Sequence, residues 1–301
     1  MEAVLVTGAL GNLGWKATEL LAGRSEWSRV LACDLGTPDP HQADRLSAWP
    51  TVEFIQCDLS KWHDLRWRGR ILEVDAVIHF AAQNPFPEAS WQEVAVSMDM
   101  TNHITTALLA SLKRQRLVYV SSNHVMGRYK ESLFGKNDSA GRLTTDLEPG
   151  VGTVWHSGIK TIDSTGYAAV KLAGERTSRT VSDATNGRIT AVNLRIGWCQ
   201  PGENDPSTLS AAGSITIERK EGVTEDPALA ETNRWFREMW LANDDFRQLM
   251  IRSLHAESTH WPGHFVTVNG MSRNRGMVWS LREGRDFLQY EPSDDVYRHL
   301  D

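Results

Sequence analysis

Tyr167 and Lys171 are the two side chains whose types and spacing point most directly to chemistry. They stand four residues apart, so on a helix they share one face. A phenol normally titrates near pH 10 and is a poor base at neutral pH, but a nearby ammonium stabilises its phenolate. The pair therefore predicts a general base, Tyr167, assisted by Lys171. Because such pairs also occur on helix surfaces, the prediction depends on the elements around them.

A glycine loop near the N-terminus is the first of these elements. An apolar run leads into Gly8, Gly11 and Gly14, spaced G-x-x-G-x-x-G, with Asn12 and Leu13 between the last two. This order predicts a strand, a tight turn and a helix start, where backbone N–H groups of all five residues approach a pyrophosphate. An ordinary glycine-rich turn remains the alternative, because the spacing differs from G-x-G-x-x-G.

Two acidic residues follow the next predicted strands. Asp34 ends the strand at residues 29–33, about 20 residues beyond the last glycine, where dinucleotide-binding folds place an acid against the adenosine ribose. A carboxylate there accepts from the 2′-hydroxyl and repels a 2′-phosphate, which favours NAD over NADP. Asp58 and Leu59 follow the strand at residues 52–57, where Asp58 is placed to accept from the adenine amino group. A solvated turn aspartate is the alternative at Asp34.

Strand and helix patterns alternate along the chain, which predicts a parallel sheet with helices on both faces. A strand at residues 74–80 ends in Ala81 and Ala82, whose small side chains let the backbone approach a cofactor. Another, at residues 117–120, delivers Ser121-Ser122-Asn123-His124 to the same edge, where open α/β sheets bind their ligands. The helices are predicted at residues 15–21 and 91–114.

The composition excludes several functional classes. The 301 residues include 32 basic and 38 acidic ones, a formal charge of −6 without a basic run, so no nucleic-acid surface is expected. No stretch of about 18 apolar residues exists, and no basic region precedes the first strand, so neither a transmembrane helix nor a signal peptide is expected. Cys33, Cys57 and Cys199 are predicted to be reduced and buried, which places the protein in the cytoplasm. No histidine cluster predicts a metal site.

Taken together, these motifs resemble the extended short-chain dehydrogenase/reductases, the NAD-dependent epimerase/dehydratase family, over nearly the whole chain. Three stretches, at residues 121–127, 194–197 and 240–246, are similar to those of uronate dehydrogenases, which oxidise the anomeric carbon of a hexuronate to an aldarolactone with NAD. The resemblance implies a Rossmann-type doubly wound parallel sheet, a small C-terminal substrate lobe and NAD as cofactor. It also implies a homodimer.

The resemblance gives the site residues their roles. Tyr167 is the general base, Lys171 is its electrostatic partner on the nicotinamide ribose, and Ser122 hydrogen-bonds the reacting hydroxyl. Many epimerases have serine or threonine where Asn123 stands, so the division of labour between Ser122 and Asn123 stays open. His124 is predicted to donate to a sugar hydroxyl, with a packing or capping role as the alternative.

Three further residues are predicted to contact the substrate. Arg195, placed just past the sixth strand, has a fork of donors suited to a carboxylate, and a structural ion pair is its alternative role. Gln83 and Asn84 follow the fourth strand, and their amide groups suit sugar hydroxyls. A polar loop start before Pro85 is the alternative for both.

The chain is predicted to divide into an NAD-binding domain, residues 1–196, and a C-terminal part, residues 197–301, that is mostly substrate lobe. The first contains an inserted segment, residues 128–166, directly before Tyr167 and longer than in most uronate dehydrogenases. This segment and residues 200–232 are predicted to be pocket walls. Two elements are predicted to return to the sheet, a helix at residues 234–255 and a strand at residues 265–268. Two tryptophans are singled out as candidates for the pocket, Trp198 and Trp279.

The predicted function is NAD-dependent oxidation of a sugar hydroxyl, at the anomeric carbon of a hexuronate or a related aldose, to a lactone. One alternative is a nucleotide-sugar epimerase or dehydratase that retains its NAD, although 301 residues leave little room for the larger lobe such enzymes need. A second alternative is a non-catalytic dinucleotide-sensing protein. The presence of both Tyr167 and Lys171 argues against it.

Overall fold

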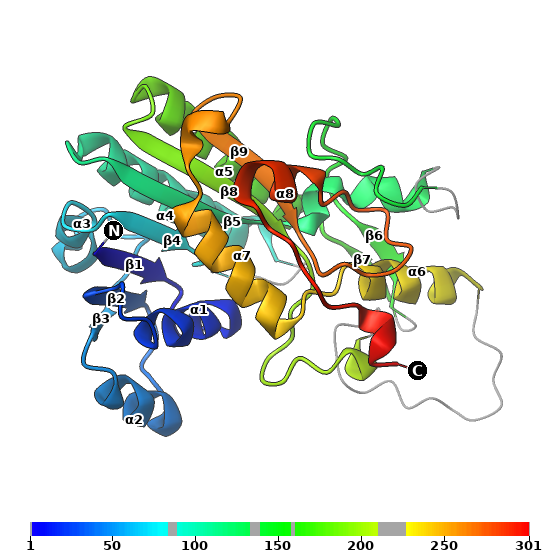
Figure 1. The fold of residues 1–301 in the computed structure, drawn as a ribbon, viewed down its shortest axis with the longest axis horizontal. Coiled ribbons are helices and arrows are strands. Elements are labelled where there is room, and N and C mark those ends of the chain that lie inside the picture. The colour runs from blue at the N-terminus through cyan, green and yellow to red at the C-terminus, as the bar shows by residue number, and fades with distance from the viewer. Residues whose placement is uncertain (1, 84–88, 133–138, 158–159, 210–226, 301) are drawn as a thin grey trace.

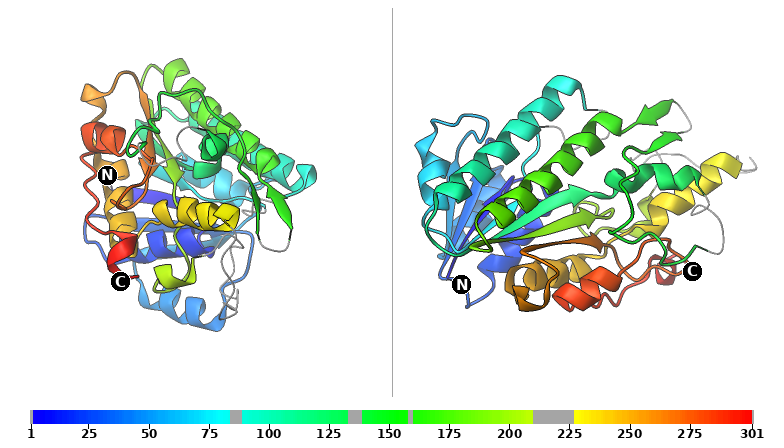
Figure 2. Two further views of the ribbon diagram at one scale, coloured as in Figure 1. Left: turned by 90° about the vertical axis from the view of Figure 1, so that its right-hand side faces the viewer. Right: turned by 90° about the horizontal axis from the view of Figure 1, so that it is seen from above.

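Seven parallel strands form one sheet in the order β3-β2-β1-β4-β5-β8-β9, with helices on both faces (Figures 1 and 2). The computed structural model describes residues 2–83, 89–132, 139–157, 160–209 and 227–300. The strand order reverses direction between β1 and β4, which is where doubly wound sheets open a crevice for a ligand. The predicted fold class, a Rossmann-type doubly wound sheet, is confirmed.

The elements have the following bounds. The strands of the large sheet are β1 (Ala3–Thr7), β2 (Arg29–Asp34), β3 (Val52–Gln56), β4 (Ala76–His79), β5 (Gln115–Ser122), β8 (Ile189–Ile196) and β9 (Phe265–Gly270). The α-helices are α1 (Asn12–Ala22), α2 (Pro40–Ala48), α3 (Leu65–Ile71), α4 (Trp91–Ala110), α5 (Thr165–Ala184), α6 (Pro227–Glu238), α7 (Asn243–His255) and α8 (Arg282–Leu288). A two-stranded antiparallel ribbon, β6 (Val154–His156) and β7 (Thr161–Asp163), and the 3₁₀ helix η1 (Asn123–Glu131) lie between β5 and α5.

Alternate residues of each strand enter two different cores, as a sheet buried on both faces requires. Val4 and Val6 of β1 pack in the core that α1 and α7 cover, whereas Leu5 packs in the core beneath α3, α4 and α5. Both cores are continuous across the sheet, so the carboxyl ends of its strands are held in fixed relative positions. The site residues follow directly from those ends.

One predicted element is wrong. The helix expected at residues 234–255 is two helices, α6 and α7, separated at residues 239–242. The break has a tertiary cause, because Trp198 uses its own backbone to bond the Met239 carbonyl at 2.9 Å and the Leu241 N–H at 2.8 Å. That pairing is incompatible with helical bonds at the same groups. The strand expected at residues 265–268 is part of β9, on the β8 edge of the sheet.

In its described parts, the segment at residues 128–166 pairs with residues 277–280 and shares an apolar cluster with α6. Residues 139–145 run beside residues 277–280, where the Leu143 N–H bonds the Val278 carbonyl at 2.8 Å. The ribbon β6–β7 then brings the chain to α5 (Figure 2). A third apolar cluster unites Trp155 of β6 with Phe236 of α6 and Trp279, so this region has a core of its own.

Two expectations from composition concern cysteines and membranes. Cys33, Cys57 and Cys199 are all buried and free, as predicted. None of the helices in the described residues has both the length and the apolar character needed to cross a membrane.

Candidate active site

The glycine loop turns sharply between β1 and α1. Gly8 has φ +67°, and a Cβ there would lie 2.9 Å from the Ala81 nitrogen. A Cβ on Gly14 would overlap the Gly8 carbonyl oxygen, so the loop closes on the helix only with glycine at this position. Gly11 caps α1 without a side-chain hydrogen bond, which leaves the N–H groups of the first turn for an anion. The loop therefore fits a pyrophosphate.

Asn12 and Leu13 contribute to this loop through their backbones. The Asn12 side chain donates to the Cys199 carbonyl at 2.8 Å, which ties α1 to the segment after β8. Leu13 is partly buried against the core on the α1 face of the sheet. Their N–H groups belong to the first turn of α1, where the prediction placed the phosphates.

Asp34 and Asp58 stand where the sequence predicted them, at the carboxyl ends of β2 and β3. The Asp34 carboxylate accepts from the Leu10 N–H and the Gly36 N–H, both at 2.9 Å, so it is held at the mouth of the loop. The Asp58 Oδ1 accepts from Ser60 N–H at 2.9 Å and Ser60 Oγ at 2.6 Å. Leu59 beside it is buried. The two carboxylates and the glycine loop together fit an adenine dinucleotide.

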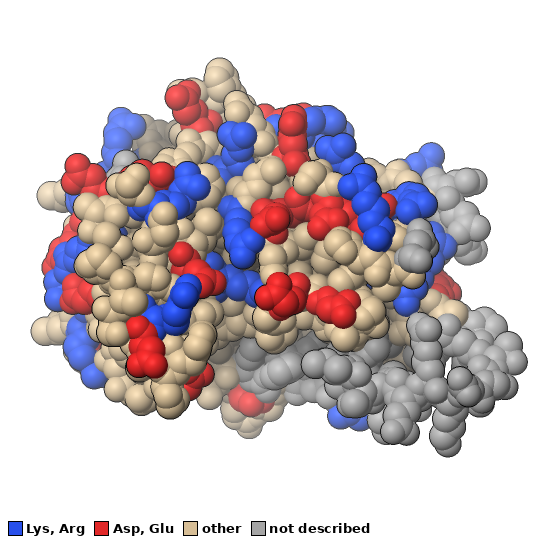
Figure 3. Space-filling view, turned by 60° about the horizontal axis from the view of Figure 1, so that its bottom comes forward, with Lys and Arg blue, Asp and Glu red and all other residues tan. Residues whose placement is uncertain are grey.

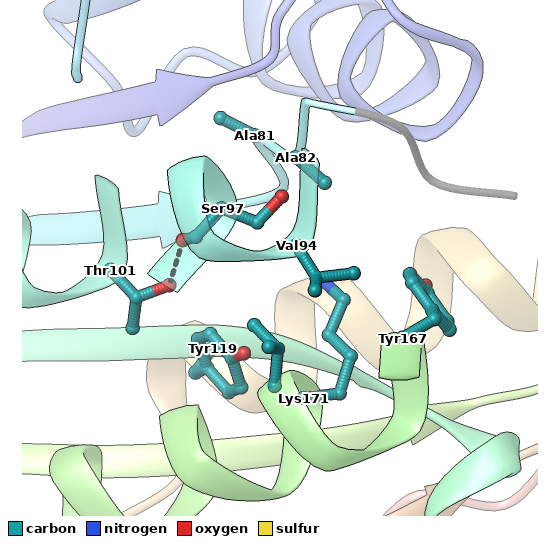
Figure 4. Close-up of a pocket in the computed structure, with 9 residues that line it drawn as sticks. Ala81, Ala82, Val94, Ser97, Thr101, Tyr119, Tyr167 and Lys171 are labelled. Atoms are coloured by element: carbon teal, nitrogen blue, oxygen red, sulfur yellow. Dashed lines mark hydrogen bonds between the residues drawn. The ribbon is translucent and has the colours of Figure 1, made fainter. Parts of the chain in front are cut away.

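A small cavity lies between the end of β4, α4 and the first turns of α5 (Figure 4). Ala81 and Ala82 form one side of it, as predicted, and Tyr167 and Lys171 extend from α5 on the other. Tyr119 of β5 lies beside Lys171. The structure thus places the predicted Tyr/Lys pair next to the predicted dinucleotide site.

Lys171 is fixed in position at the edge of β5. Its Nζ donates to the Val120 carbonyl at 2.8 Å and lies 5.5 Å from the Tyr119 ring centre and 5.8 Å from the Tyr167 ring centre. Gly174 allows α5 to pack closely on Tyr119 of β5, because a Cβ at this position would overlap the Tyr119 hydroxyl. Burial lowers the pKa of Lys171 to about 8, since desolvation disfavours the ammonium.

The electrostatics of Tyr167 differ from the prediction. The sequence predicts a phenol pKa lowered by Lys171, whereas burial raises the pKa of Tyr167 to about 12. A hydrogen bond with the Ser122 side chain acts in the opposite direction and lowers it. Within the chain alone, desolvation therefore outweighs the stabilisation of the phenolate.

Ser122 and Asn123 have different surroundings. The Ser122 hydroxyl meets Tyr167 and also accepts from the His124 N–H at 3.2 Å, which caps η1. Asn123 donates from Nδ2 to the Ile196 carbonyl at 3.0 Å, and its buried Oδ1 has no hydrogen-bond partner among the described residues. This geometry favours Ser122 at the reacting hydroxyl and gives Asn123 the role of joining the ends of β5 and β8.

His124 is buried in an aromatic cluster on the substrate side. Trp155 stacks on it with ring centres 5.8 Å apart, and Tyr167 approaches edge-on at 6.0 Å. Phe236 packs on Trp155 and on Trp198, each with ring centres 4.9 Å apart. Burial lowers the pKa of His124 to about 4, so the ring is neutral at physiological pH.

Sequence reasoning missed several residues of this cluster. Trp155 lies within the inserted segment, but nothing in its local pattern pairs it with His124. Phe236 lies 112 residues after His124 in the sequence. Of the two tryptophans singled out, Trp198 packs on this cluster, whereas Trp279 is buried against Trp235 at 5.3 Å.

The prediction for Arg195 needs correction. It lies within β8, not past it, and its guanidinium pairs with the buried Glu175 of α5 at 3.0 Å (Nε–Oε1) and 2.9 Å (Nη2–Oε2). Glu175 also accepts from the Ser121 hydroxyl at 2.6 Å. The remaining Nη1 is buried, and the part of the chain that the structure describes offers it no hydrogen-bond partner. The fork is therefore already used, and the structural ion pair is the role that the geometry supports.

The structure describes one of the two amide residues predicted after β4. Gln83 is exposed, and its backbone N–H donates to Ser97 Oγ at 2.9 Å. Asn84 lies outside the described residues. Gln83 therefore remains a candidate at the mouth of the cavity.

Charges do not gather into a single-sign surface on the face seen in Figure 3, where basic and acidic side chains lie next to one another. Among the described residues, no group of three or more histidine, cysteine, aspartate or glutamate side chains has the arrangement of a metal site.

Comparisons with known proteins agree with this geometry. The model of the NAD dependent epimerase/dehydratase family matches residues 4–198. An L-arabinose 1-dehydrogenase (NAD(P)(+)) of Haloferax volcanii is 28% identical over 301 residues, 98% of each chain. A uronate dehydrogenase of Pseudomonas syringae pv. tomato is 27% identical over 98% of this chain and 84% of its own.

Among solved structures, a UDP-glucuronic acid 4-epimerase from Bacillus cereus, in complex with UDP-glucuronic acid and NAD, superposes with a TM-score of 0.66. It is 16% identical and is matched over 99% of this chain and 96% of its own. At that identity the likeness concerns the fold.

Proposed function

The chain belongs to the NAD dependent epimerase/dehydratase family, and from this premise we propose that it oxidises the anomeric carbon of an aldose to a lactone with NAD. The carrying observation is Tyr167 on the first turn of α5, one turn before Lys171, whose Nζ lies 5.8 Å from its ring centre, in the cavity that Ala81 and Ala82 line at the end of β4. The full-length similarity to two sugar dehydrogenases supports the same chemistry. NAD, when bound, supplies the hydride acceptor at nicotinamide C4.

The chain's own residues have separable roles in this proposal. Ser122 hydrogen-bonds the anomeric hydroxyl and orients it toward Tyr167, which removes its proton as the hydride leaves the same carbon. Lys171, an ammonium below about pH 8, stabilises the phenolate and retains two donors for the nicotinamide ribose besides its bond to Val120. The apolar walls formed by Trp155 and Phe236 exclude water from the reacting carbon.

Within this class we favour a neutral aldose over a hexuronate. A carboxylate needs a free cation, and Arg195 is paired with Glu175. The cation beside the Tyr167 ring is Lys171, which donates to the Val120 carbonyl and lines the cavity with Ala81 and Ala82. A hydroxyl-only substrate suits an aromatic pocket with a neutral histidine.

The test is NAD reduction by the purified protein with neutral pentoses and hexoses, hexuronates and hexose phosphates, with Tyr167→Phe alongside. We expect turnover of a neutral aldose and a loss of about 10²–10⁴-fold in kcat for Tyr167→Phe with NAD binding retained. Tyr129→Phe is the matched control, because its hydroxyl donates to the Glu148 carbonyl outside the site.

Other outcomes discriminate among the alternatives. Turnover of hexuronates alone would overturn the preference for a neutral aldose. Silence across the panel, with NAD retained by the purified protein, would favour a nucleotide-sugar epimerase or dehydratase. Unchanged turnover in Tyr167→Phe would overturn the mechanism itself.

We also propose a homodimer, as the family resemblance implies, and a cytoplasmic location, as the buried free cysteines suggest. Trp91 at the start of α4 and Leu109 at its end are 69% and 44% exposed, which supports a partner on this helix. Light scattering of the purified protein tests the proposal, and a monomer at micromolar concentration would overturn it.

A further inference from the structure

Three aromatic rings pack on the ring of His124. Trp155 stacks on one face at an interplanar angle of 13°, and Phe236 packs beside the ring at 6.4 Å. Tyr167 meets it edge-on, at an interplanar angle of 81°. Such packing fixes the direction in which each ring nitrogen points, so the hydrogen-bond partners of Nδ1 and Nε2 are decided by the fold.

Two hydroxyls of the inserted segment meet Nδ1. Thr153 Oγ1 lies 2.8 Å and Ser164 Oγ 3.1 Å from it, and both residues are fully buried. Among the described residues, the hydrogen-bond partner of the Thr153 hydroxyl is Nδ1 of His124. If Nδ1 carried the proton, the hydroxyl proton of Thr153 would be buried without an acceptor, which is unfavourable.

Ser164 agrees with the same proton arrangement. Its oxygen accepts from the Thr153 N–H at 2.7 Å, and its own proton can bond either Nδ1 or the Thr153 carbonyl at 3.2 Å. Neither arrangement requires a proton on Nδ1. The Thr153 hydroxyl therefore donates to Nδ1, and the proton of the neutral imidazole lies on Nε2.

Nε2 is the free end of this chain of hydrogen bonds. It makes no hydrogen bond to the described residues, and it is not among their fully buried polar atoms that lack a partner. The edge-on contact with Tyr167 places the ring beside the proposed general base. A protonated Nε2 is then a donor that the described residues leave unpaired, on a ring that packs against Tyr167.

We infer that Thr153 and Ser164 are positioning residues that fix His124 as the Nε2–H tautomer, so that His124 donates to an oxygen of the sugar next to the reacting carbon. The inference rests on the proposed function for its ligand, a sugar bound at Tyr167. The accepting sugar oxygen is the ring oxygen or the oxygen of a neighbouring hydroxyl, because the anomeric hydroxyl donates its own proton to Tyr167. No proton is transferred through His124.

Two glycines allow the inserted segment to reach the ring. A Cβ on Gly127 of η1 would overlap Thr153 Oγ1, and Gly152, with φ +89°, would overlap Thr165 Oγ1 if it carried one. The Gly152 N–H also bonds the His124 carbonyl at 3.0 Å. The backbone before Thr153 is thus shaped to bring its hydroxyl against Nδ1.

The first experiment measures the tautomer directly, by nitrogen-15 NMR of the full chain with labelled histidine, without sugar. We expect the unsubstituted protein to show His124 with Nε2 protonated and Nδ1 as an acceptor. Thr153→Val removes the hydroxyl at nearly constant volume and should populate the Nδ1–H form, and Thr153→Ser should restore the original state. The control is Thr161→Val, an exposed position on β7. A proton on Nδ1 in the unsubstituted protein, or no change in a Thr153→Val, Ser164→Ala double variant, would overturn the positioning role.

The second experiment measures steady-state kinetics with the aldose that the panel identifies. Loss of one hydrogen bond predicts a fall of about tenfold in kcat/KM for the sugar in Thr153→Val, with the KM for NAD unchanged and with recovery in Thr153→Ser. Unchanged sugar kinetics together with an altered tautomer would overturn the substrate contact. Absence of any sugar turnover in the unsubstituted protein would overturn the proposed function instead, and the NMR measurement would still decide the positioning role.

Discussion

The cofactor side of the site and the substrate side are built in different ways. The cofactor side consists of the carboxyl ends of β1 to β4, where glycines close a loop and backbone N–H groups hold Asp34. The proposed substrate side consists of η1, the β6–β7 ribbon, α6 and residues 197–204, where buried side chains from distant segments hold one another. The first is encoded locally and the second depends on tertiary contacts, so substitutions on the two sides should fail in different ways.

The Arg195–Glu175 pair gives the largest expected effect, because it joins β8 to the helix that bears Tyr167. Arg195→Ala leaves the Glu175 carboxylate buried without its cation, which should lower the free energy of unfolding by about 3–5 kcal/mol. Urea unfolding at pH 7 measures this. A double variant, Arg195→Met with Glu175→Leu, should recover most of the loss, since neither charge remains.

The control for this prediction is Arg24→Ala, whose partner Glu26 is exposed and whose removal should change stability little. A stable Arg195→Ala protein with a raised KM for a hexuronate would contradict the structural role. It would return Arg195 to the carboxylate clamp that the sequence suggested.

On the cofactor side, Gly14→Ala should produce a binding defect. The new Cβ would overlap the carbonyl oxygen and carbon of Gly8. These are backbone atoms, which cannot shift without opening the loop. We expect at least about a 100-fold weaker affinity for NAD, roughly 3 kcal/mol, measured by calorimetric titration. Gly69→Ala in α3 is the control, because nothing lies within 4 Å of its Cβ position and alanine favours a helix. Equal NAD affinity in Gly14→Ala would show that the loop does not hold the pyrophosphate.

How far the sequence predicted the site follows from the same contrast. The positions of the glycine loop, Asp34, Asp58 and the Tyr167/Lys171 pair at one edge of the sheet agree with the sequence prediction, because each is a residue type at a fixed distance from a strand end or along one helix. Their roles stay predictions. Spacing alone was enough, and the fold class followed from the alternation of elements.

The substrate side was predicted less well, because its partners are far apart in sequence. Arg195 was named without its partner, 20 residues earlier on α5, and a guanidinium has the same appearance in a sequence whether it meets a ligand or a buried acid. The break between α6 and α7 depends on hydrogen bonds to the backbone of Trp198. The hydrophobic periodicity of the sequence does not reveal such a contact. The phenol pKa of Tyr167 was misjudged because burial is a property of the folded chain.

Acid should lower the free energy of unfolding by equal amounts through one buried histidine on each side. This tests whether the two sides also differ in their contribution to stability. Burial lowers the pKa of His79, between Thr7 and Thr101 on the cofactor side, to about 3, and that of His124 to about 4. Unfolded histidine binds a proton below about pH 6.5 and the folded rings do not, so the stability present above that pH is lost as the pH falls toward 4. Each histidine should account for about 2 kcal/mol between pH 8 and pH 5.

Urea unfolding of His79→Asn and His124→Asn at the two pH values separates these contributions. Each variant should lose its own share of the pH dependence and keep the other. A pH dependence unchanged in both variants would show that other groups control the acid transition.

The smallest expected effect is a change of cofactor preference at Asp34. Its two oxygens accept from Leu10 and Gly36 N–H groups, so the carboxylate is fixed where an adenosine ribose would meet it. Asp34→Ser keeps a short polar side chain and removes the charge that repels a 2′-phosphate. We expect the ratio of kcat/KM for NADP to that for NAD to rise about tenfold, or roughly 1.4 kcal/mol, mainly through the KM of each cofactor.

Asp39→Ser is the matched control, because Asp39 caps α2 by accepting from the Gln42 N–H at 2.8 Å and serine is also a good helix cap. Its cofactor ratio should equal that of the unsubstituted protein. An unchanged ratio in Asp34→Ser as well would mean that cofactor choice is made elsewhere, and the cofactor side would then depend on distant residues as the substrate side does.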